Sequence, residues 1–213
     1  MKHLKSKILI GLIAISINSY GQNNGHKNSI SIGGGRESYN GDLGNSWFKP
    51  KEEFYAFVTL SYSRYLSKSF DITASVSHGD YGRCRDSDED AIRADGTEVL
   101  NMLSRLTTGV LSIKYKLANG YILREDSKLA PYIYLGGGIN NLSNYWWENK
   151  NRVNTGNYGS INGGIGLRYN FYKNINLSYD LGFGYFTSDN IDKRIEGKND
   201  MYMQHSLLLG INF

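Results

Sequence analysis

Cysteine is nearly absent from this 213-residue chain. Cys84 is the only one, so an intrachain disulfide is excluded. Only two prolines occur beside 25 glycines and 17 tyrosines, a composition that favours a β protein of many strands with aromatic belts. After residue 21 no run approaches the roughly 20 apolar residues of a transmembrane helix. Any crossing of a membrane must therefore use strands.

The amino-terminus has the pattern of a secretory signal peptide. Three lysines within the first seven residues precede an apolar stretch at 8–17, and Ser19 and Gly21 supply small residues before a cut at Gln22. No cysteine lies near that cut, which argues against a lipoprotein. We therefore expect a signal peptide at 1–21 and a single barrel domain at 22–213.

The positive charge of the whole chain belongs mostly to this leader. The chain carries 24 basic and 20 acidic residues, and residues 1–21 contain three of the lysines and none of the acids. The remaining 21 basic residues nearly balance the 20 acidic ones. We expect no nucleic-acid partner, because the mature chain has no basic excess.

Eight segments alternate apolar and polar residues with a period of two, which is typical of strands with one apolar face. Long links alternate with short ones, except that the link at 118–129 is longer than a minimal turn. An even strand count with this alternation predicts an antiparallel up-and-down transmembrane β-barrel with both termini at one end. The predicted strands cover 29–38, 54–66, 70–79, 104–117, 130–140, 158–169, 175–187 and 201–213.

The alternation also assigns the two faces of each strand. Leucines and isoleucines should face lipid, and the hydroxyl and amide side chains between them should face the lumen. A soluble lipocalin-like barrel is the alternative fold, and it would reverse these faces. The test residues are Leu60, Ile72, Leu135, Leu177 and Leu209 for the lipid face, and Thr73, Ser75, Ser178 and Gln204 for the lumen.

The last strand closes on an aromatic residue, Phe213, and resembles the assembly signal of outer-membrane barrels. The whole chain resembles the OmpA/OmpX-type family of small eight-stranded barrels, including the stretches at 114–117, 120–123 and 130–134. This resemblance implies a bacterial outer-membrane location, periplasmic short turns and termini, and contact with outer-membrane lipid, lipopolysaccharide and the barrel-assembly machinery. The peptidoglycan-binding domain of larger relatives is not expected, since the chain stops at strand eight.

Five charged residues share the parity of the lumenal face. Charges inside a narrow barrel must pair, because burying an unpaired charge is costly. The pattern predicts a salt-bridged plug, with Asp71 paired to Lys114 or Lys116, and the alternative is a gated pore for small solutes. The predicted lumenal network is Asp71, Lys114, Lys116, Arg168 and Asp180.

No catalytic, cofactor or metal site is predicted. The acidic stretch at 86–90 resembles a calcium loop, but Ala91 and Thr97 stand where that loop needs glycine and glutamate. His78 and His205 lie on the outward face without the serine that a lipid deacylase needs beside them. A lipid-modifying enzyme is therefore the weaker alternative.

Aromatic residues in the long links are the candidate contacts with an extracellular ligand: Trp47, Phe48, Trp146 and Trp147. Aromatics also gather at the bilayer interface, so a girdle or loop-packing role is the alternative. The function expected from the sequence is structural or interaction-based: outer-membrane integrity, with the loops available for adhesion or ligand contact.

Overall fold

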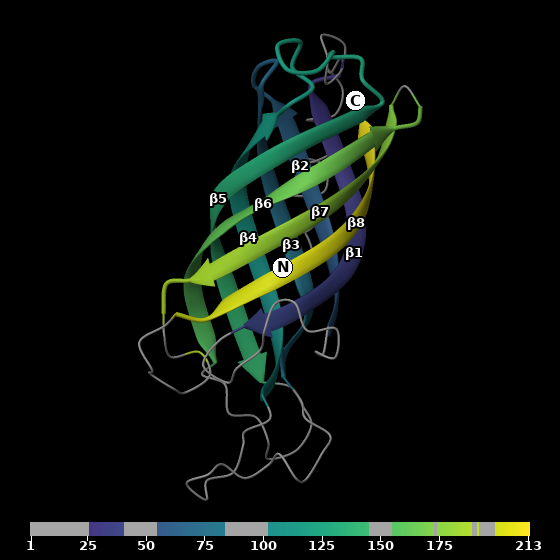
Figure 1. Cartoon of the computed structure of the whole chain (residues 1–213). Coiled ribbons are helices and arrows are strands. Elements are labelled where there is room, and N and C mark those ends of the chain that lie inside the picture. The colour runs from purple at the N-terminus through teal and green to yellow at the C-terminus, as the bar shows by residue number, and fades with distance from the viewer. Residues whose placement is uncertain are drawn as a thin grey trace, which may run out of the picture.

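The computed structural model describes residues 26–40, 55–83, 102–144, 155–172, 174–188, 191 and 199–213. These residues form the predicted fold, a closed antiparallel β-barrel in which each strand pairs with its neighbours in the chain and β1 pairs with β8 (Figure 1). Within them, no helix is long and apolar enough to span a membrane. The strands are β1 (Asn28–Asn40), β2 (Tyr55–Tyr65), β3 (Phe70–Arg83), β4 (Met102–Lys116), β5 (Leu129–Asn144), β6 (Gly156–Asn170), β7 (Ile175–Phe186) and β8 (Met201–Asn212).

The register shows how far the strands are staggered. Moving from Ile30 to each successive cross-strand partner leads once around the barrel and back to β1 at Asn40, ten residues further along. A stagger of this size requires strands tilted by roughly 40° from the barrel axis. Residues at the same height on neighbouring strands are therefore not direct cross-strand partners, and the stagger determines which outward residues share a height.

The apolar face of the strands lies outside. Leu60, Leu135 and Leu209 are 54, 66 and 49% exposed, Leu177 is also exposed, and Ile72 is half-buried. On the other face Thr73 and Ser178 are buried, while Ser75 and Gln204 line a cavity in the lumen. The faces thus follow the prediction for a transmembrane barrel, and the lipocalin-like alternative is wrong.

Two strands run four residues further than the alternation predicts. β3 continues to Arg83 and β5 to Asn144, beyond the predicted ends at 79 and 140. The added outward positions are polar, as Asp80 and Asn141 show, so the apolar pattern stops before the hydrogen-bonded ladder does. A hydropathy pattern does not show how far a strand extends beyond the apolar band.

The short turns, the start of β1 and the end of β8 all lie at the same end of the barrel, at the top in Figure 1. The amide of Asn28 donates to the carbonyl of Phe213 at 3.0 Å, and the amide of Phe213 donates back at 2.8 Å. We call this the short-turn end and the opposite one the long-link end.

The longer link between β4 and β5 is an ordered turn built around Asn119, which is fully buried. Its carboxamide oxygen accepts hydrogen bonds from the amides of Tyr121 and Ile122, at 3.0 and 3.1 Å, and its nitrogen donates to Ser69 Oγ. Gly120 takes a positive φ of 82°, which glycine adopts without strain. The additional residues of this link therefore form a fixed structure that is attached to the β2–β3 turn.

Candidate functional site

The five predicted lumenal charges lie in the part of the lumen nearer the short-turn end. Asp71 comes from β3, Lys114 and Lys116 from β4, Arg168 from β6 and Asp180 from β7. All five occupy inward positions of their strands, so the alternation of the pleat brings together residues from four different strands. We call this set, with the ring of Tyr132, the charged layer.

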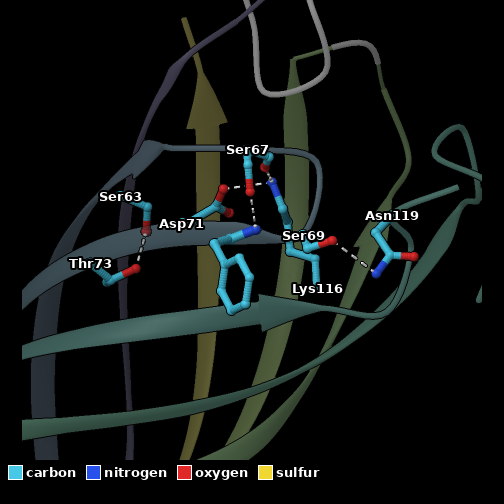
Figure 2. A network of polar contacts seen from close by, with 8 residues as sticks. Ser63, Ser67, Ser69, Asp71, Thr73, Lys116 and Asn119 are labelled. Atoms are coloured by element: carbon cyan, nitrogen blue, oxygen red, sulfur yellow. Dashed lines mark hydrogen bonds and ion pairs between the residues drawn. The ribbon is translucent and has the colours of Figure 1, made fainter. Parts of the chain in front are cut away.

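Asp71 and Lys116 form the ion pair at the edge of this layer (Figure 2). Lys116 Nζ lies 2.6 Å from Asp71 Oδ1, and the two side chains are 13 and 0% exposed. The ammonium also donates to the carbonyl of Ser67 at 3.1 Å and lies 4.2 Å from the centre of the Tyr65 ring. The predicted pair between Asp71 and a β4 lysine is present, with Lys116 as the partner.

Lys114 is arranged differently, although it is the direct cross-strand partner of Asp71. Its ammonium lies 4.2 Å from the centre of the Tyr132 ring, and the guanidinium of Arg168 lies 5.8 Å from the same ring. The Tyr132 hydroxyl donates to Asp180. One aromatic ring therefore connects two cations to a carboxylate, so the layer is not a simple chain of salt bridges.

Gly166 makes room for this ring. It is the cross-strand partner of both Tyr132 and Asp180, and a Cβ added there would collide with the atoms of both side chains. The sequence shows that Tyr132 faces inward, but its central place between the charges depends on this glycine on the next strand. Pairing across strands, rather than spacing along them, determines the site.

A further polar layer, which we call the second polar layer, lies on the long-link side of the charges and was missed by the sequence prediction. Glu37 is only 3% exposed and accepts a hydrogen bond from the Gln204 amide. Close by in the register, the Tyr202 hydroxyl donates to Asn162. The parity of β1, with Ile30 outward, already places Glu37 inward, so the signal was present in the sequence.

An apolar cluster fills the lumen near the long-link end. Its members are 0 to 2% exposed, and three aromatic rings form its centre. The ring centres of Phe186 and Tyr202 are 5.4 Å apart, and Tyr81 contacts both at 5.9 and 6.5 Å. We call this cluster the apolar cap, and it consists of Tyr81, Leu106, Leu142, Phe186, Ile191 and Tyr202.

Two cavities lie on either side of the charged layer. One, of about 90 Å³, lies between that layer and the second polar layer, and serines and threonines such as Ser61, Ser75 and Thr59 line it. The other, of about 430 Å³, opens at the short-turn end between the β4–β5 and β6–β7 turns. Tyr132 and Arg168 border both cavities, so the charged layer forms the wall between them.

The remaining sequence candidates divide into two groups. His78 and His205 lie on outward positions, where His78 Nδ1 is 2.8 Å from Thr107 Oγ1 and His205 Nδ1 is 2.6 Å from the Tyr179 hydroxyl. In the part of the chain that the structure describes, no group of His, Cys, Asp and Glu is arranged to hold a metal ion. The leader at 1–21, the acidic stretch at 86–90 and the residues Trp47, Phe48, Trp146 and Trp147 lie outside the described residues.

The chain belongs to the family described as "Domain of unknown function (DUF6089)", which it matches over residues 6–210. No curated protein matches the chain. Among solved structures, Neisserial surface protein A is 13% identical with a TM-score of 0.55, and the alignment covers 87% of this chain and 97% of that one.

Two further structures are similar over most of the chain. The Yersinia pestis attachment invasion locus protein Ail, in complex with the heparin analogue sucrose octasulfate, is 17% identical with a TM-score of 0.49 and coverages of 91 and 99%. The amino-terminal β-barrel domain of Pseudomonas aeruginosa OprF is 18% identical, with the same TM-score and coverages. At these identities the likeness to Neisserial surface protein A establishes the fold of a small outer-membrane barrel, and the resemblance predicted from the sequence holds at that level.

Proposed function

We propose that this protein is a non-conducting, non-enzymatic barrel of the bacterial outer membrane that supports the envelope and makes surface contacts through its long links. In this proposal the short-turn end faces the periplasm, and with it the start of β1 and the end of β8. The observation that carries it is the filled lumen. The apolar cap closes one end, and the charged layer closes the other.

The cap is the strongest argument against a pore. Opening it would expose Tyr81, Phe186 and Tyr202, and burying one such side chain contributes about 1.5–3 kcal/mol. The ion pair of Asp71 and Lys116 adds a second barrier, because a passing solute would have to displace a buried charge pair. Both barriers support a closed barrel over the small-solute pore.

The outer surface supports residence in a bilayer. Every strand presents exposed apolar side chains on its outward face, among them Val58, Leu111, Ile139 and Leu207 at 53 to 68% exposure. Such a band suits lipid tails. Outer-membrane lipid, lipopolysaccharide and the barrel-assembly machinery are the partners that this proposal includes.

The outward histidines give little support to an enzyme. His205 is hydrogen-bonded to Tyr179, and its same-face neighbours along β8 are Met203 and Leu207, so no serine nucleophile stands beside it there. The test is the mass of lipid A from cells that express the protein. We expect it to be unchanged, and a loss or gain of an acyl chain would establish the enzyme.

The closed lumen is tested by current recordings in planar bilayers. We expect no conductance steps from the wild-type barrel, and small steps from a variant with both Tyr81→Ala and Phe186→Ala, which removes two rings of the cap. Phe183→Ala is the matched control, because this aromatic lies on the outward face and should leave the barrel silent. Regular steps from the wild type would overturn the proposal in favour of a pore.

The contact role is separated from the envelope role by link variants. We expect a chain with Trp47→Ser, Phe48→Ser, Trp146→Ser and Trp147→Ser to restore dye exclusion in cells that lack the protein, but to reduce their adhesion to surfaces. Loss of dye exclusion at normal barrel levels would show that these aromatics serve the envelope itself, which contradicts the contact role.

A further inference from the structure

Arg36 interrupts the apolar outer face of the barrel. Along β1 the outward positions carry Ile30, Ile32, Gly34 and then Arg36, whose side chain is exposed. Its cross-strand partners are Ala56 of β2 and His205 of β8. A cation on the lipid side of a barrel is costly unless it reaches the headgroups or meets an anion.

The register places Arg36 at the long-link side of the apolar band, level with apolar residues on three strands and with the polar His78 on β3. Positions at the same height along the barrel axis are offset from the direct cross-strand partners, by ten residues in total over the eight strands. By this offset Arg36 lies about level with Val58, Ile161 and Phe183. These three outward side chains are apolar and exposed at 64, 57 and 37%. Arg36 lies in the half of the band nearer the long-link end, so its long side chain can extend toward the headgroups on that side.

Two further polar groups stand beside the guanidinium. His205 faces outward opposite Arg36, and its ring nitrogen Nδ1 lies 2.6 Å from the hydroxyl of Tyr179 on β7. Among the described residues, no hydrogen bond or ion pair involves Arg36. The outer surface therefore presents a cation, an imidazole and a phenol together in a region of lipid-facing apolar side chains.

A groove accompanies these groups. A hollow of about 350 Å³ is open to the outside and is lined by Gly34, Arg36, Tyr179, His205 and Leu207. At the outward position Gly34 no side chain fills the space between Ile32 and Arg36. The walls of the groove are mainly apolar, and Arg36, His205 and Tyr179 are the polar residues at its outward positions, which suits an acyl chain attached to an anionic head.

We infer that this surface binds a phosphate group of lipid A, with an acyl chain of the same molecule in the groove at Gly34. A guanidinium binds phosphate through two parallel hydrogen bonds, and the imidazole and the phenol add further polar contacts. The inference rests on the proposed orientation, which places the long-link end, and with it Arg36, in the outer leaflet, where lipid A is the phosphate-bearing lipid.

The test is native mass spectrometry of the refolded barrel in detergent, with three probes: bis-phosphorylated lipid A, the same lipid A without phosphates, and phosphatidylglycerol. We expect the wild type to retain phosphorylated lipid A, and Arg36→Ala to weaken retention by about tenfold, as loss of a charged hydrogen-bond donor would. Tyr179→Phe should weaken it by a smaller factor. Arg64→Ala is the matched control, because Arg64 is also exposed on the outward face but lies at the short-turn end, and it should bind like the wild type.

Three results would overturn the inference. Equal retention of dephosphorylated lipid A would mean that the acyl chains alone bind, and equal retention of phosphatidylglycerol would make the ligand a general phospholipid. Unchanged retention by Arg36→Ala would move the site elsewhere. These failures are distinct from failure of the proposed function, because a silent barrel in planar bilayers would still support a closed structural role.

Discussion

The buried pair of Asp71 and Lys116 gives the most quantitative prediction. Asp71→Asn keeps the size of the side chain but removes its charge, and Lys116 then loses its only carboxylate partner among the described residues. Removing one member of a buried pair costs about 3–5 kcal/mol. Lys116 keeps its hydrogen bond to the Ser67 carbonyl and its contact with the Tyr65 ring, so we expect the lower limit, about 3 kcal/mol.

The assay is equilibrium unfolding by urea in detergent micelles. The heat-dependent gel migration of the folded barrel measures the folded fraction at each urea concentration. Asp71→Asn with Lys116→Met should recover most of the lost free energy, because no uncompensated charge remains. The control is Asp126→Asn in the exposed β4–β5 turn, where the hydrogen bond from Arg124 holds the pKa of the Asp126 carboxyl below its usual value. That variant should unfold like the wild type. A stability of Asp71→Asn within about 0.5 kcal/mol of the wild type, the range of ordinary surface changes, would refute the reasoning.

Four further changes probe other parts of the barrel. Gly166→Val should displace the Tyr132 ring and lower the urea midpoint more than Gly137→Val, since a Cβ added at the outward Gly137 comes no closer than 4.0 Å to any atom beyond its chain neighbours; equal midpoints would contradict the packing of the charged layer. Asn119→Ala should destabilise the barrel by about 2 kcal/mol through lost hydrogen bonds and open the β4–β5 turn to protease, and unchanged digestion would argue against its central role in the turn. Glu37→Gln should keep the contact with Gln204, because the new amide oxygen also accepts a hydrogen bond, and leave stability equal or higher at pH 7, because a neutral amide is less costly to bury than a group that can ionise; a clear loss would show that the carboxyl group itself is required. Phe213→Ala should reduce outer-membrane levels in cells more than it reduces stability after refolding, and parallel losses would assign Phe213 to stability alone.

The sequence predicted the features that repeat along each strand. The two-residue period placed Leu60 and Leu135 outside and Thr73 inside, and it placed all five charges on inward positions. It also narrowed the partner of Asp71 to two lysines, because the β2–β3 hairpin and the β4 alternation bring the ends of β3 and β4 together. Properties that depend on the period of a single strand can be predicted from the sequence.

Features that depend on contacts between different strands and turns could not be predicted from the sequence. The choice of Lys116 over Lys114 depends on the Ser67 carbonyl and on Tyr132, which lie on other segments. The apolar cap combines residues from regions that the hydropathy pattern assigned to links: Tyr81 and Leu142 lie on strands that extend beyond the apolar band, and Ile191 lies in the link between β7 and β8. Glu37 was available from its parity and was overlooked.

The central claim is that the lumen is sealed from both ends, and thiol labelling tests it most directly. In a Cys84→Ser background, Ser75→Cys places a thiol at the cavity between the charged layer and the second polar layer. We predict that a charged methanethiosulfonate reagent does not modify this thiol in liposomes from either side, but modifies it once Tyr81→Ala and Phe186→Ala remove the cap rings. Rapid modification of the Ser75→Cys thiol with the cap intact would contradict the closed barrel.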